Sequence, residues 1–136
     1  MGFLWSKQSD KPTTKAQGDG AEDQALAHLL RAGLVLRARN FKTPGRGGGE
    51  VDLIMQDRDG TLVFVEVRLR SSVAFGGPLA SVDTRKRRRL VLAAQHYLMD
   101  HACTPPCRFD VVGVAQRLGQ EPPALEWVKA AFDAQT

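Results

Sequence analysis

The sequence predicts an α/β domain in which a mixed β-sheet is flanked by helices. Three observations lead to this prediction: an apolar hairpin over residues 49–68, amphipathic helical patterns on either side of it at 21–32 and 81–101, and a further apolar strand at 108–115. Elements in this order bury their apolar faces best when the helices pack against a sheet. The chain has 136 residues, which suits one such domain.

The first predicted helix covers residues 21–32. Its apolar side chains recur at the spacing of one helix face, Asp19 can cap its start, and Gly33 can end it. Glu22 falls on the apolar face, although the helix dipole also favours an acid in the first turn. The polar residues 1–20 predict a flexible N-terminal tail.

A strand predicted at 34–41 is followed by a glycine-rich loop at 42–49, which contains Arg46. The apolar hairpin comes next. Its turn suits a three-residue loop with Gly60 in the left-handed conformation. These signals together predict three consecutive strands joined by a loop and a tight turn.

The hairpin register decides which side chains share a face of the sheet. It sets Asp52 opposite Glu66 and Glu50 opposite Arg68, with all four side chains on one face. The apolar residues between them are expected on the other face: Val51, Leu53, Val63, Val65 and Val67. Opposed carboxylates repel, and burying an unpaired charge costs several kcal/mol. A bound cation is therefore the leading explanation for Asp52 and Glu66.

The second predicted helix covers residues 81–101, with Ser81 or Asp83 as its cap. Five basic residues follow one another near its start. Lys86 falls in the middle of the apolar face, whereas three arginines point sideways or outward: Arg85, Arg87 and Arg88. A solvated face and contact with nucleic acid are both compatible with the arginines, but the acidic hairpin favours a functional role for Lys86.

The C-terminal part of the chain predicts one clear strand at 108–115, with Asp110 as an acid embedded among apolar residues. A short final strand is expected at 125–128. The domain as a whole is expected over residues 21–130, with a C-terminal tail at 131–136.

Composition narrows the class of protein. The net charge is +4 and the isoelectric point is about 9.4, which favours polyanionic partners. No apolar run approaches the ~20 residues that span a membrane, so we expect no membrane partner. No export signal is recognised, so we expect a cytoplasmic protein. Two cysteines and two histidines lie near one another: His96, His101, Cys103 and Cys107. Their spacing matches no usual zinc pattern, so ordinary loop residues are preferred over a metal site.

The motifs now described resemble those of the YraN-like family of small bacterial proteins predicted to be endonucleases. This family is placed in the PD-(D/E)XK superfamily of restriction-endonuclease-like and Holliday-junction-resolvase-like proteins. The matching segments are residues 21–33, 49–54, 62–68, Phe75-Gly76, Lys86 and 108–112. The resemblance implies a restriction-endonuclease-like αβββαβ core.

The resemblance also implies a catalytic site that binds Mg²⁺ or Mn²⁺. By position, Asp52 and Glu66 match the metal-binding acids, Glu22 matches a helix glutamate of resolvase-like members, and the carbonyl of Val67 is a further ligand. Arg68 stands where the superfamily has a lysine. Arginine keeps its proton at physiological pH and cannot act as a base, although it can stabilise negative charge.

The expected activity is metal-dependent hydrolysis of DNA, including branched or junction DNA, with Asp52, Glu66, Arg68 and Lys86 as catalytic residues. RNA is not excluded as a substrate, and a homodimer is considered because junction resolvases act as dimers. The basic side chains expected to bind nucleic acid are Arg46, Arg85, Arg87 and Arg88.

Two alternatives remain open. The chain could be a nucleic-acid-binding module that keeps the nuclease fold without catalysis, because arginine replaces the usual lysine. The acids could instead be purely structural, with Glu50 paired to Arg68 and Asp52 paired to Lys86.

Overall fold

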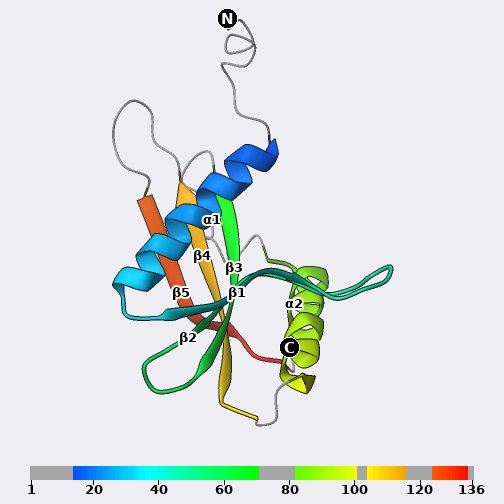
Figure 1. Cartoon of the computed structure of the whole chain (residues 1–136). Helices are drawn as coiled ribbons and strands as arrows, with labels where there is room; N and C mark the ends of the chain where they lie inside the picture. Colours follow the sequence, from blue (N-terminus) through cyan, green and yellow to red (C-terminus); the bar gives the residue numbers. More distant parts are fainter. Residues whose placement is uncertain (1–13, 71–81, 101–103, 116–123, 135–136) are drawn as a thin grey trace, which may run out of the picture.

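The computed structural model of the chain describes residues 14–70, 82–100, 104–115 and 124–134 (Figure 1). It contains two helices and five strands within these ranges. The elements in chain order are α1 Thr14–Arg31, β1 Val35–Lys42, β2 Glu50–Gln56, β3 Leu62–Arg70, α2 Thr84–Met99, β4 Cys107–Ala115 and β5 Ala124–Phe132.

The five strands form one mixed sheet in the order β1-β2-β3-β4-β5. Only the central pair, β3 and β4, runs parallel, because α2 connects the two strands. Helix α1 packs on one face with Ala25 and Leu29, and helix α2 packs on the other with Leu90 and Tyr97 (Figure 1). The predicted α/β class and its mixed sheet are confirmed. Among the described residues, neither helix is long and apolar enough to cross a bilayer.

Helix α1 begins earlier than the sequence analysis predicted. It starts at Thr14, so Asp19 lies inside the helix and is not its cap. The first turns lack the apolar periodicity on which the prediction relied. The predicted end is confirmed, because Gly33 has a φ of +100° directly after the helix.

The predicted hairpin register is confirmed next to the turn, from Gln56 opposite Leu62 to Leu53 opposite Val65. The predicted pairs Asp52–Glu66 and Glu50–Arg68 lie beyond these paired residues. Ile54 pairs with Phe64, Gln56 pairs with Leu62, and the N–H of Asp57 donates to the carbonyl of Thr61 at 2.9 Å. Gly60 has a φ of +92°, as the three-residue loop requires. The register therefore carries Asp52 of β2 towards Glu66 of β3.

Strict alternation of side chains fails at one point of β2. Val51 packs with Ile54 in the core beneath α2, whereas Leu53 packs beneath α1, so the prediction that Val51 and Leu53 share a face is wrong. The neighbouring strand β1 holds Asn40 at a φ of +53°, between the residues that pair with Leu53 and Val51. This left-handed residue breaks the pleat and turns the end of the β1–β2 ribbon.

Strand β5 is longer than predicted, since it runs to Phe132 rather than ending at residue 128. Phe132 is 9% exposed and stacks on Phe109 with ring centroids 5.0 Å apart. A single phenylalanine in a polar segment gave no periodic signal, so the sequence predicted a tail where the structure has the end of a strand.

Candidate active site

Two carboxylates meet between β2 and β3, beneath the start of α2. Glu66 is 2% exposed, and Asp52 accepts a hydrogen bond from the backbone N–H of Val67 at 2.7 Å. Burial, followed by the neighbouring charge of Glu66, raises the pKa of Asp52 to about 7. The Val67 N–H and the charge of Lys86 act against this increase without cancelling it.

Two cations converge on Glu66. The Nη1 atom of Arg68 lies 3.2 Å from Glu66 Oε2, and the Nζ atom of Lys86 lies 3.5 Å from the same oxygen. Lys86 reaches this point from the first turn of α2, where the helix dipole disfavours a cation. The contact with Glu66 supplies a reason for lysine at that position. The prediction that Lys86 points inward is confirmed.

The cap of α2 places Lys86. Asp83 accepts a hydrogen bond from the backbone N–H of Lys86 at 2.9 Å, and its carbonyl accepts from the N–H of Arg87. Asp83 is therefore the N-cap, as one of the two predicted candidates. Ser81, the other candidate, lies outside the described residues.

Glu22 is engaged with β1 rather than with the carboxylate pair. Its Oε1 atom lies 3.6 Å from Arg39 Nε, and the amide nitrogen of Asn40, in its hydrogen-bonding orientation, donates to Glu22 at 3.2 and 3.3 Å. No group of three or more Asp, Glu, His or Cys side chains is arranged to hold an ion within the described residues. Asp52 and Glu66 would thus need Val67 or water to complete an ion's coordination, and the Val67 carbonyl remains a predicted ligand.

Glu50 pairs with α2 and not with β3. Its Oε1 atom lies 2.5 Å from Arg89 Nη2, so the predicted pairing of Glu50 with Arg68 is wrong. Arg68 turns to Glu66 because that carboxylate is buried and closer to its own strand position. Helical spacing gives Arg89 no clear place on either face of α2, and its partner lies on a distant strand, so no local pattern predicts this contact.

The residues predicted to bind nucleic acid do not share one environment. Arg46, Arg85 and Arg88 are exposed. Arg87 instead turns towards the protein, since its Nε donates to the Val82 carbonyl at 3.1 Å and its guanidinium lies 5.2 Å above the ring of Phe132. Contacts within the protein therefore account for the position of the Arg87 side chain. The three exposed arginines stay candidates for binding nucleic acid.

The histidine and cysteine cluster is only partly described. His101 and Cys103 lie outside the described residues, and the exposed thiol of Cys107 donates to the Pro105 carbonyl at 3.4 Å. Burial of its sulfur raises the pKa of Cys107, which keeps the thiol protonated at neutral pH.

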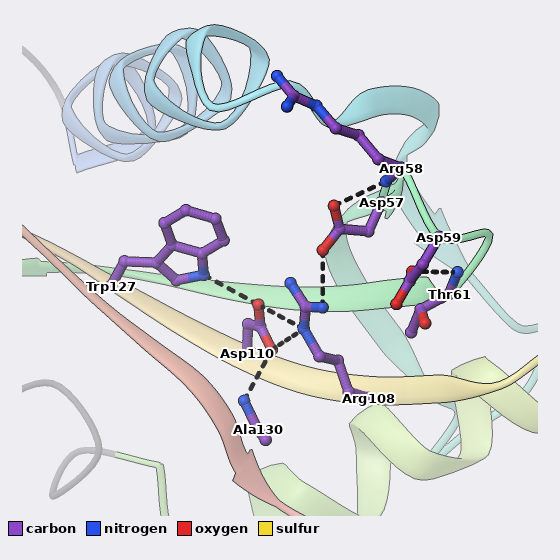
Figure 2. Close-up of polar contacts among 8 residues, drawn as sticks. All are labelled: Asp57, Arg58, Asp59, Thr61, Arg108, Asp110, Trp127 and Ala130. Atoms are coloured by element: carbon purple, nitrogen blue, oxygen red, sulfur yellow. Dashed lines mark hydrogen bonds and ion pairs between the residues drawn. The ribbon is translucent and has the colours of Figure 1, made fainter.

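A second group of buried charges lies on the other face of the sheet, towards α1 (Figure 2). Asp110 is fully buried and accepts hydrogen bonds from Arg108 Nε at 3.1 and 3.2 Å, Trp127 Nε1 at 2.9 Å and the N–H of Ala130 at 3.0 Å. Arg108 also donates to Asp57 at 2.8 Å, which ties the hairpin turn to β4. The sequence showed Asp110 as an embedded acid but gave no sign of these partners, because Trp127 and Ala130 come from β5.

Fold and site together define an α/β domain with a core of the restriction-endonuclease-like kind, in which the buried Glu66 and the part-buried Asp52 lie beneath the N-terminus of α2. The chain belongs to the uncharacterised protein family UPF0102, whose family model matches residues 21–114. That segment includes Glu22, Asp52, Glu66 and Lys86.

Relatives of high identity span the whole chain. A UPF0102 protein of Paracidovorax citrulli is 60% identical over 98% of this chain and 99% of its own length. One from Acidovorax sp. is 53% identical over the same shares of the two chains. One from Verminephrobacter eiseniae is 58% identical over 90% of this chain and 82% of its own length.

Proposed function

We propose that this protein is a metal-dependent endonuclease that hydrolyses phosphodiester bonds in DNA and belongs to the PD-(D/E)XK superfamily. The observation that carries the proposal is the pair Asp52 and Glu66, a part-buried and a buried carboxylate that lie close together on the β2–β3 hairpin. The raised pKa of Asp52 indicates that the protein alone does not fully stabilise both negative charges.

The residues present fit a small divalent cation. Carboxylate oxygens and a backbone carbonyl are hard donors, which suit Mg²⁺ or Mn²⁺ better than zinc. Asp52 and Glu66 would hold the ion, with the Val67 carbonyl or water as further ligands. Such an ion, when bound, polarises the scissile phosphate and lowers the pKa of a bound water.

Two cations take part in the proposed reaction. Lys86 and Arg68 both lie at Glu66, where their positive charges stabilise the negative charge that develops on the phosphate. Arg68 cannot take a proton from water, because its guanidinium stays charged at any physiological pH. Lys86 is therefore the residue whose ammonium replaces the usual lysine.

The substrate is held by charge and shape. Arg85 and Arg88 are exposed on α2, on the helix that carries Lys86, and Arg46 is exposed on the loop between β1 and β2. Such side chains bind backbone phosphates without reading sequence, and their affinity falls as salt rises. Branched DNA is a candidate substrate, RNA is a further one, and a homodimer would place two such sites on one junction.

Cleavage assays test the proposal. Purified protein is incubated with duplex, flap and four-way-junction DNA in Mg²⁺ or Mn²⁺, beside Asp52→Asn and Lys86→Met. We expect both substitutions to lower the cleavage rate by roughly a hundredfold or more, because each removes charge stabilisation at the phosphate. Glu126→Gln, an exposed acid of β5, is the matched control and should cleave as the wild type does. Equal cleavage by wild type and Asp52→Asn would contradict the proposal.

A binding module without catalysis is the second candidate, and the arginine at position 68 favours it. Calorimetry separates the two functions. A nuclease binds Mn²⁺ at Asp52 and Glu66, and the binding disappears in Asp52→Asn. A module that only binds DNA shows salt-sensitive DNA affinity with no measurable Mn²⁺ affinity.

A further inference from the structure

The loop at residues 42–49, which we call the β1–β2 arm, projects past α2 and away from the sheet (Figure 1). Its base is closed by Thr43, which is buried although it lies in a loop. The Thr43 Oγ1 atom accepts a hydrogen bond from the N–H of Gly49 at 2.6 Å, and the N–H of Thr43 donates to the Gly49 carbonyl at 2.9 Å. These bonds give the arm a defined base.

The tip of the arm presents one cationic side chain. The N–H of Gly48 donates to the Gly45 carbonyl at 3.3 Å, and Gly47 has a φ of +73°, as at the third position of a type II turn. Arg46 occupies the corner of this turn and is exposed. A Cβ atom added at Gly45 or Gly47 would meet nothing within 4 Å, so the tip is slender and surrounded by open space.

The arm is fastened to α2 near the candidate active site. Arg89 donates from Nε to the Gly48 carbonyl at 3.2 Å and pairs with Glu50. A Cβ atom added at Gly49 would lie 2.5 Å from the backbone nitrogen of Ala93, so the arm rests directly on the helix backbone. Lys86 lies about one turn before Arg89 on the same helix. The arm therefore has a set position relative to Lys86.

We propose that the β1–β2 arm reads the minor groove of double-stranded DNA, with Arg46 inserted into the groove. The inference rests on the proposed function for its choice of DNA as partner, and it adds that the substrate is duplex on this side of the site. The minor groove is about 6 Å wide, which excludes a helix but admits an arginine side chain on a slender turn. Narrow grooves of A·T-rich duplexes carry the strongest negative potential and attract arginine.

Basic residues around the arm could contact the DNA phosphates on either side of the minor groove. A hollow of about 200 Å³ at its base is lined by residues that include Lys42, Gly48 and Arg89. Lys42 is exposed, and Arg85 and Arg88 are exposed on α2. Phosphates flanking the groove can thus contact cations while Arg46 lies between the strands.

Binding to matched duplexes tests the proposal. Fluorescence anisotropy is measured without divalent ions for an A·T duplex, a G·C duplex and the same G·C duplex with inosine in place of guanine. Inosine lacks the amino group that guanine places in the minor groove, and the major-groove edge is unchanged. We expect the wild type to prefer the A·T and inosine duplexes over G·C on the order of tenfold.

Variants assign that preference to the arm. Arg46→Ala should bind all three duplexes equally, whereas Arg31→Ala removes one exposed charge at the end of α1 and should keep the preference. A wild type without preference, or an Arg46→Ala variant that retains it, would overturn the proposal. A loss of affinity that is equal for all duplexes would mean that Arg46 contacts phosphate only.

Two further variants test the role of the helix. Arg89→Gln and Gly49→Ala keep Arg46 but loosen or displace the base of the arm, so each should lose most of the preference. Thermal melting identifies any variant that fails to fold. If Gly49→Ala fails to fold, Arg89→Gln alone tests the role of α2, because it adds no atoms between the arm and the helix. Preference retained in folded Arg89→Gln would contradict the role of α2.

The readout is independent of turnover, because no divalent ion is present. Absence of cleavage with an Arg46-dependent groove preference would defeat the hydrolase proposal and leave this inference intact. Cleavage that depends on Asp52, together with a groove preference that survives Arg46→Ala, would support the hydrolase proposal and overturn this inference.

Discussion

Two groups of buried carboxylates lie in the same sheet and differ in what surrounds them. Asp110 accepts hydrogen bonds from a guanidinium, an indole N–H and a backbone N–H, and it is fully buried (Figure 2). Asp52 faces Glu66, and its pKa rises to about 7. If the proposed function holds, burial alone does not distinguish a structural acid from one that binds a ligand. The supply of donors around the acid separates a structural carboxylate from one that can bind a ligand.

The largest effect is expected at Asp110. Asp110→Ala removes the buried acceptor of Arg108 Nε, of the Trp127 N–H and of the Ala130 N–H, so the free energy of unfolding should fall by about 3–5 kcal/mol. Urea denaturation measures the change. Glu126→Ala, which removes an exposed acid of β5, is the control and should change stability little. A loss below about 1 kcal/mol at Asp110 would remove the contrast between the two groups.

A smaller effect is expected at Trp127. Trp127→Phe keeps an aromatic ring against His28, whose ring lies 5.8 Å away, but removes the hydrogen bond to Asp110. Hydrogen bonds to charged groups contribute about 1.5–3 kcal/mol, so a loss of about 2 kcal/mol is expected in the same denaturation assay. An unchanged midpoint would show that the remaining donors satisfy Asp110.

The smallest change in stability is expected for Asp52→Asn, which should stabilise the protein where the previous two substitutions destabilise it. Its pKa rises from 3.8 to about 7 on folding, so the folded protein binds this proton more tightly than the unfolded chain does. The free energy of unfolding should therefore fall as pH rises between these two values. Asp52→Asn should remove this part of the pH dependence and stabilise the protein at pH 8 by about 1 kcal/mol.

Divalent ions sharpen the same comparison. Mn²⁺ should raise the melting temperature of the wild type at pH 8, because a bound cation offsets the repulsion between the carboxylates of Asp52 and Glu66. The melting temperature of Asp52→Asn should not change with Mn²⁺. A destabilised Asp52→Asn with no response of the wild type to Mn²⁺ would make Asp52 structural, like Asp110.

The sequence predicted the parts of the fold and site that depend on local patterns. Gly60 and the alternating strands set the register that brings Asp52 to Glu66, and helical spacing singled out Lys86. Contacts between distant elements were missed. Arg89 to Glu50 and Trp127 to Asp110 join strands and helices far apart in the chain, and no short-range periodicity reports such pairs.

Some differences had a backbone cause. Asn40 takes a left-handed conformation within β1, and the neighbouring Val51 packs in the core beneath α2. An asparagine in a strand pattern does not by itself predict a left-handed conformation. Phe132 extended β5 because it stacks on Phe109, a contact made across a bulge in the β4–β5 pair.

The single parallel pairing, β3 with β4, has a consequence for the order of folding. The β2–β3 hairpin is local in sequence, and we expect it to form early. The parallel pair must wait for α2 to cross over, which is a slow, long-range closure. Asp57, on the early hairpin, meets Arg108 only at that later step. The bond between them therefore joins the first part of the sheet to the last, and we expect it to slow unfolding more than it speeds folding.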